Sequence, residues 1–163
     1  MAVTIRGSGQ LVVQEVQTVK TSIFTTTTAL PSFTDITGAT ANITPTNSAN
    51  KILVTVTGTI SNGSSTYGSA VNLVRGSTSI AVGDARGSAT SSFYGSNFTG
   101  VVATGNIALC FLDSPATTSA TTYKLQLGSE SGGTAYIGGS AYTAGASGTN
   151  TPITITLEEI AYA

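Results

Sequence analysis

The chain has 163 residues, of which six are Lys or Arg, seven are Asp or Glu and none is His, so it is almost neutral. Only 8% of its residues are charged, which excludes the dense positive surface that nucleic-acid binding or a polybasic membrane contact requires. Its 30 Thr, 20 Ser and 19 Gly, combined with 40% apolar residues, indicate a folded β-protein with a hydroxyl-rich surface. We expect a single domain of residues 11–163 after an N-terminal arm of residues 1–10, and no secretion signal.

Segments of alternating apolar and polar residues follow one another along the chain, separated by clusters of Gly, Ser, Asn and Pro. In the segment 51–60, Ile52, Val54 and Val56 share one face and threonines occupy the other, as in a half-buried strand. No window combines helical spacing with a capping residue. The pattern predicts an all-β sandwich or jelly roll. The predicted strands are Leu11–Val19, Ser22–Thr28, Ala41–Thr44, Lys51–Ile60, Ala70–Arg75, Thr78–Val82, Val101–Phe111, Thr122–Leu127 and Pro152–Ile160.

The segment 107–112 is apolar on both faces of its predicted strand. Its alternating positions are Ile107, Leu109 and Phe111 on one side, and Ala108, Cys110 and Leu112 on the other. Strands that are covered on both sides have this pattern, so the second cover comes from a loop or from a neighbouring subunit. The low charge of the chain favours the subunit. The lone Cys110 is interpreted as a small buried hydrophobic residue.

Catalytic chemistry finds little support in the sequence. The absence of His removes the usual partner of a Ser or Cys nucleophile and the commonest ligand of transition metals. Glu158 and Glu159 are adjacent on a strand and point to opposite faces, so they cannot flank one bond. Asp113 is expected to cap a turn, and Asp84 to pair with Arg75 or Arg86. We predict no enzyme activity, no cofactor and no metal site, although a calcium site built from Asp and backbone carbonyls stays open.

Two Gly- and Ser-rich stretches carry aromatic residues, and we predict that these stretches are loops or irregular strand edges. Tyr among Ser, Gly and Asn suits a recognition surface, for example one that stacks on sugars. The alternative is that the rings fold back onto the sandwich as small local cores. The aromatic residues concerned are Phe93, Tyr94, Phe98, Tyr136 and Tyr142.

Several segments resemble small virion proteins of tailed phages, especially marine and cyanobacterial phages. The most specific is Leu112–Gln126, which contains the run Asp-Ser-Pro-Ala-Thr-Thr. The other segments, which occur in the order of that family and with Leu112–Gln126 cover most of the chain, are Val12–Lys20, Phe33–Gly38, Asn50–Val54, Asn72–Gly76 and Ile153–Ile160.

The resemblance implies an antiparallel jelly-roll β-sandwich that forms a homotrimer, related to the heads of tumour-necrosis-factor-like ligands. In that architecture the C-terminal strand lies near the threefold axis. Carried onto this sequence, the trimer interface would be lined by Ile107, Leu109, Phe111, Ile153, Ile155 and Leu157.

Two functions from different classes are compatible with this resemblance. The first is a trimeric fibre-like appendage or fibre tip whose loops attach to host surface polysaccharide, with avidity from its three copies. The second is a capsid decoration or cement protein that stabilises the shell. In both, the protein is located in the virion and its partners are its own copies and baseplate, fibre or capsid proteins. Val3, Ile5 and Arg6 are the predicted virion anchor, because they offer an edge strand for pairing.

Overall fold

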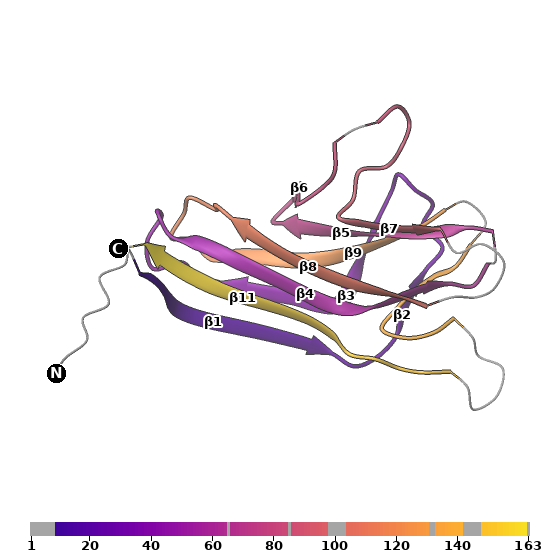
Figure 1. Ribbon diagram of the computed structural model, residues 1–163, viewed down its shortest axis with the longest axis horizontal. Coiled ribbons are helices and arrows are strands. Elements are labelled where there is room, and N and C mark those ends of the chain that lie inside the picture. The colour runs from indigo at the N-terminus through magenta and orange to yellow at the C-terminus, as the bar shows by residue number, and fades with distance from the viewer. Residues whose placement is uncertain are drawn as a thin grey trace.

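A computed structural model describes residues 9–64, 66–84, 86–97, 104–130, 133–141 and 148–162. Within these ranges the chain forms strands and no helix, arranged as two stacked antiparallel sheets (Figure 1). The strands are β1 (Gln10–Lys20), β2 (Phe24–Thr26), β3 (Thr34–Ile43), β4 (Lys51–Asn62), β5 (Gly68–Arg75), β6 (Thr78–Ile80), β7 (Tyr94–Asn97), β8 (Thr104–Asp113), β9 (Thr121–Ser129), β10 (Ala135–Ile137) and β11 (Ile153–Tyr162).

The first sheet, called sheet A, has the order β1-β11-β4-β10-β2, and β8 pairs with the other side of β4. The second, called sheet B, has the order β3-β9-β5-β6, and β7 also pairs with β5. Five nested pairs connect the chain from its ends inward: β1 with β11, β2 with β10, β3 with β9, β4 with β8, and β5 with β7. A long hairpin wrapped into two sheets in this way is a jelly roll, so the predicted fold class is confirmed.

The core lies between the sheets and is formed by the inward positions of their long strands. Ile52, Val54 and Val56 of β4 are 0% exposed, as their alternation predicts. Tyr123 and Leu125 of β9 meet them from sheet B with the same burial. Burying side chains of this size contributes about 1.5–3 kcal/mol each, which makes this layer the main source of stability.

Strand β3 is longer than predicted, and β7 and β10 are strands that the sequence did not predict, in each case for a local reason. The predicted strand Ala41–Thr44 is the end of a longer one, β3, whose register shifts between Asp35 and Thr40. Gly38 adopts a φ of 84° within this bulge, and such a backbone breaks the apolar alternation. The short strands β7 and β10 lie in stretches that were predicted to be loops or irregular strand edges. Strands of three or four residues are too short to show a period.

Candidate binding and assembly surfaces

The residues predicted to line a trimer interface lie mostly inside a single chain. Ile107, Ile153, Ile155 and Leu157 are at most 2% exposed and belong to the core cluster. Their prediction as interface residues is therefore wrong, because inward positions of β8 and β11 pack against sheet B of the same chain. Leu109 is half-buried and packs against this core, and Phe111 is also half-buried.

The opposite face of β8 is uncovered. Ala108, Cys110 and Leu112 all point outward and are exposed, with Leu112 at 45%. The interpretation of Cys110 as buried is wrong, since its position in the alternation places it on this outer face. One of the two apolar faces of β8 therefore packs into the core. The other is not covered within the described part of the chain.

β8 is also an edge of sheet A, since within the described residues it pairs only with β4. The register continues its outer face across the sheet in rows. Cys110 lies beside Thr55 of β4, and Thr55 beside Thr156 of β11. Uncharged hydroxyl groups therefore occupy the middle of the outer face of sheet A next to the apolar positions of β8.

The other edge of sheet A, β1, is built differently. Its register shifts between Val12 and Gln14, which is a bulge. Thr18 Oγ1 donates a hydrogen bond to the Thr40 carbonyl, 2.9 Å away, and Gln14 Nε2 donates one to the Thr44 carbonyl, 2.7 Å away. These bonds tie the β1 edge to β3 and the loop after it, although Val12 remains 48% exposed.

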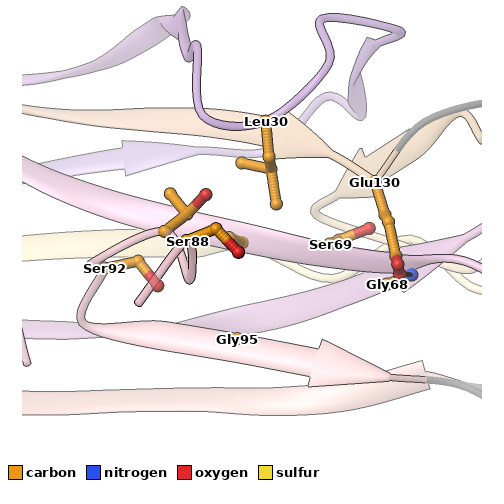
Figure 2. Close-up of a pocket in the computed structure, with 9 residues that line it drawn as sticks. Leu30, Gly68, Ser69, Ser88, Ser92, Gly95 and Glu130 are labelled. Carbon is orange, nitrogen blue, oxygen red and sulfur yellow. Dashed lines mark hydrogen bonds between the residues drawn. The ribbon is translucent and has the colours of Figure 1, made fainter. Parts of the chain in front are cut away.

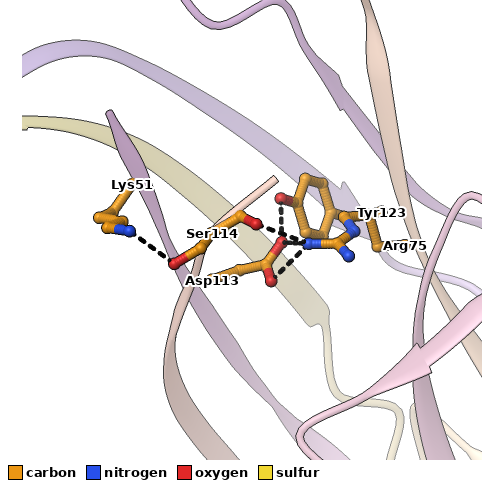
Figure 3. Close-up of polar contacts among 5 residues, drawn as sticks. All are labelled: Lys51, Arg75, Asp113, Ser114 and Tyr123. Atoms are coloured by element: carbon orange, nitrogen blue, oxygen red, sulfur yellow. Dashed lines mark hydrogen bonds and ion pairs between the residues drawn. The ribbon is translucent and has the colours of Figure 1, made fainter. Parts of the chain in front are cut away.

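Asp113 links the two sheets at one end of the sandwich (Figure 3). Its carboxylate accepts hydrogen bonds from Arg75 Nη1, at 2.7 and 2.8 Å, and from the Tyr123 hydroxyl, at 2.7 Å. Arg75 Nη1 also donates a hydrogen bond to the Ser114 carbonyl. The hydroxyl group of Ser114 accepts one from Lys51 Nζ. Asp113 comes from β8 in sheet A, whereas Arg75 and Tyr123 come from β5 and β9 in sheet B.

This cluster corrects two sequence predictions. Asp113 does not cap a turn, because its side chain lies on the inward face of β8 and is 7% exposed. Arg75 pairs with Asp113, and in the described ranges Asp84 has no salt bridge. Burial, followed by the hydrogen bond to Asp113, raises the pKa of the Tyr123 hydroxyl far above its usual 10. The cluster is a structural connection, since its carboxylate is fully occupied by protein donors.

Glu159 is a second buried carboxylate, and Glu158 beside it faces outward, as predicted. Glu159 Oε1 accepts hydrogen bonds from the Thr46 amide and hydroxyl and from Asn50 Nδ2, at 2.6–2.8 Å. Its Oε2 accepts one from Gln14 Nε2 at 2.6 Å. Burial alone raises the pKa of this carboxyl, but the donors from Asn50, Gln14 and Thr46 together outweigh burial and lower it to about 2.

The remaining acidic groups form no metal site among the described residues, where no three Cys, Asp or Glu side chains gather around one point. Asp35 pairs with Lys124 at 2.6 Å and accepts a hydrogen bond from Gln126, and these two partners lower its pKa. Gln126 lies beside Asn72 of β5, whose Oδ1 is buried and has no partner among the described residues.

A polar cleft lies on the outer side of sheet B, over β5 (Figure 2). We call it the β5 cleft, and its volume is about 470 Å³. It lies between the loop that carries Leu30 and the segment that joins β6 to β7, with Glu130 at one end. The cleft is lined by Leu30, Gly68, Ser69, Ala70, Ser88, Thr90, Ser92, Gly95 and Glu130.

The aromatic residues predicted for host binding do not form one loop surface in the described residues. Phe93 and Tyr94 are half-buried and pack against the core, so the alternative of a small local core holds for them. Tyr136 lies on β10, where its ring approaches Gly63. Phe98 and Tyr142 lie outside the described residues, as does the predicted anchor of Val3, Ile5 and Arg6.

The sequence missed the β5 cleft because its lining comes from four separate segments of the chain. Leu30, residues 68–70, residues 88–95 and Glu130 meet only through the pairing of β5 with β7 and β9. The one local signal is the density of Ser and Thr after β6, a composition that predicts a loop or an irregular strand edge.

Comparisons with known proteins give little guidance on function. No protein-family model and no curated protein matches the chain. A structure of the infectious bursal disease virus Gx strain matches at 14% identity and a TM-score of 0.35. A mutant VP2 protein of infectious bursal disease virus, from derived T=1 particles, matches at 16% identity and a TM-score of 0.34. The matches cover 92% of this chain but only 37% of those chains, and likenesses this weak support no functional argument.

The described residues were also considered as possible membrane-spanning segments. Among the described residues, no helix has the length and apolar character needed to cross a bilayer.

Proposed function

We propose that this chain is a structural protein of a virus particle, which forms a homotrimeric fibre-like appendage or fibre tip that contacts the host surface. The observation that carries the proposal is the bare edge of sheet A at β8. Folded proteins guard such edges with charges, Pro residues or bulges, because an unguarded edge pairs with other chains. β8 pairs with β4 over ten residues without a bulge, and no charged residue or Pro lies between Thr104 and Leu112.

A second copy of the chain is the partner that fits this edge best. The outer face beside it carries apolar and hydroxyl side chains on β4, and Glu158 and Glu15 lie farther along the row of Leu112. The whole chain has a net charge of −1, so copies repel one another weakly. Contact between copies would cover Ala108, Cys110 and Leu112 together. A closed oligomer removes the exposed edge, whereas an open one leaves it at each end.

The location in a virion is supported by the sequence resemblance to small virion proteins of tailed phages. That resemblance includes Leu112–Gln126, the segment that begins at the bare edge. In this setting the trimer is attached to baseplate, fibre or capsid proteins, and its exposed loops contact host polysaccharide. Low surface charge suits this contact, because most of the available groups are neutral hydroxyls.

Light scattering after size-exclusion chromatography tests the assembly directly. The native chain is expected at three times its mass of 16.3 kDa. Leu112→Asp should give a folded monomer, since Leu112 is already 45% exposed in the single chain and a charge is costly only when a neighbour covers it. Thr118→Asp is the matched control, because it adds the same charge at an exposed position outside β8. A monomeric native chain, or a trimeric Leu112→Asp variant, would contradict the assembly through β8.

Copy number separates the appendage from a shell protein. Quantitative mass spectrometry of purified virions should find far fewer copies of this chain than of the major capsid protein. A copy number close to that of the capsid protein would instead make it a decoration protein, and absence from the particle would refute both.

A further inference from the structure

We propose that the β5 cleft binds a neutral saccharide, a proposal that rests on the function in host attachment put forward above. The cleft has the right size, since about 470 Å³ lies in the lower part of the range of small-molecule sites and accommodates one or two sugar rings. It is formed by described residues of β5 and β7, the Leu30 loop, the segment before β7, and Glu130.

The lining matches the chemistry of a sugar. The segment before β7 contributes the hydroxyl groups of Ser88, Thr90 and Ser92 to the lining, and a hydroxyl can both donate and accept hydrogen bonds. The Ser92 hydroxyl already donates to the Tyr94 carbonyl at 3.1 Å, so toward a ligand it acts as an acceptor. Leu30 on the opposite wall and Ala70 in the floor offer apolar contact to the C–H groups of a ring. A ligand with hydroxyls on its rim and a C–H face fits both kinds of surface at once.

The charges of the lining favour a neutral ligand. Among the described lining residues there is no Lys or Arg, so a sulfated, phosphorylated or sialylated group would enter without a cation from them to balance it. Glu130 is the single charged residue of this described lining, and its acceptor oxygens suit the hydroxyl donors of a sugar. An anionic saccharide is therefore repelled, and a neutral one is held.

Two features hold these groups in place before a ligand arrives. Glu130 is fixed on Gly68, because Oε2 accepts the Gly68 amide at 2.8 Å and the Glu130 amide donates to the Gly68 carbonyl at 2.9 Å. Leu30 packs over Gly128, where a Cβ would approach the Leu30 side chain to 2.5 Å. Preformed walls reduce the ordering cost of binding.

The floor offers a substitution that fills the cleft without straining the fold. A Cβ at Gly95 would meet only Ser92 Oγ, at 3.9 Å, and Gly95 does not have a positive φ. Gly95→Leu should therefore occupy the ligand volume and leave the strands intact. Gly83→Leu is the matched control, since a Cβ there meets nothing within 4 Å and Gly83 does not line the cleft.

The test is a titration of the purified oligomer, isotope-labelled for NMR, with glucose, galactose, N-acetylglucosamine and lactose, and with glycerol and sialic acid as comparators. We expect at least one neutral sugar to shift resonances of cleft residues with a dissociation constant of about 1 mM, the range for a ligand of this size. Gly95→Leu should abolish the shifts and Gly83→Leu should preserve them. Glu130→Gln should weaken binding roughly fivefold, since it removes charge-assisted hydrogen bonds.

The outcomes separate this inference from the proposed function. If no neutral sugar shifts cleft resonances, if Gly95→Leu binds like the native chain, or if sialic acid or glycerol binds as well as the sugars, the saccharide site is refuted. The mass of the oligomer and its presence in virions are measured independently of the titration. A trimer that is found in virions but binds no sugar would refute only the cleft, whereas a monomer that binds sugar would refute only the assembly.

Discussion

Replacing Glu159 with Gln removes a charge that solvent does not reach. Its side chain is 0% exposed, and four donors from Thr46, Asn50 and Gln14 point at its two oxygens. An amide has one acceptor oxygen, so its NH2 group would face at least one of these donors. The fall of the pKa from an ordinary 4.5 to about 2 corresponds to about 3 kcal/mol of stability at pH 7.

The pH dependence gives this prediction its sign. Because the folded state holds the carboxyl pKa below its unfolded value, the contribution is fully present above pH 4.5 and is lost as the pH falls through about 2. We therefore expect Glu159→Gln to lower the free energy of unfolding by about 4 kcal/mol at pH 7, of which about 3 kcal/mol comes from the lost charge and about 1 kcal/mol from the mismatched amide. The difference from the native chain should shrink steadily between pH 4.5 and pH 2, to the roughly 1 kcal/mol of the mismatched amide.

Urea unfolding followed by circular dichroism, at one protein concentration and several pH values, measures this difference. Glu158→Gln is the matched control, because Glu158 is the neighbouring residue, faces outward and lies opposite Glu15. It should change stability by less than about 0.5 kcal/mol at any of these pH values. A loss below about 1 kcal/mol for Glu159→Gln at pH 7, or a loss that is the same at pH 7 and pH 3, would refute the reasoning.

Three further predictions concern the sheet connection and the bare edge. Arg75→Met should lower the free energy of unfolding, measured with urea, by about 2–4 kcal/mol, since it leaves the buried Asp113 without a cation. Most of this loss should disappear when Asp113→Asn is added, and additive losses would contradict the pairing. Tyr123→Phe should lower the free energy of unfolding by about 2 kcal/mol near neutral pH. Because the pKa of the Tyr123 hydroxyl is raised in the folded state, the native chain should lose stability above pH 10, where the unfolded phenol ionises, and the variant should lose less. Stability curves of the two chains that run parallel above pH 10 would count against this. Cys110 should react with a thiol reagent at least tenfold faster in the Leu112→Asp variant than in the native oligomer, and equal rates would mean that β8 stays uncovered.

The sequence predicted the parts of the fold that depend on local alternation. The period of two placed Ile52, Val54 and Val56 inward, because successive side chains of a strand point to opposite faces of the sheet and the apolar face is the buried one. The same argument separated Glu158 from Glu159. It did not reveal that Glu159 is buried, because its donors lie 109 to 145 residues away in the chain.

The predicted interface was wrong for a related reason. An aliphatic residue such as Ile155 or Ile107 has the same alternation whether it is covered by its own chain or by a neighbour. The pattern of β8 identified two apolar faces but not which one packs into the core. The resemblance assigned the interface to the face that the structure fills with sheet B, and the outer residues Ala108, Cys110 and Leu112 are left as the exposed set.

The unequal edges of sheet A limit how copies can assemble. Growth of a continuous sheet from copy to copy would require both edges to be free, with β8 of one copy beside β1 of the next. The β1 edge is unsuited to this, since it bulges after Val12 and its Gln14 and Thr18 side chains bind carbonyls of the opposite layer. Among the described strands of sheet A, β8 is therefore the longest edge without a bulge, and it carries exposed apolar side chains. This asymmetry disfavours an open filament of continuous sheets. In the proposed trimer the outer face of β8 therefore packs on a different surface of the next copy around the threefold axis, because a β8-to-β8 contact would close as a dimer.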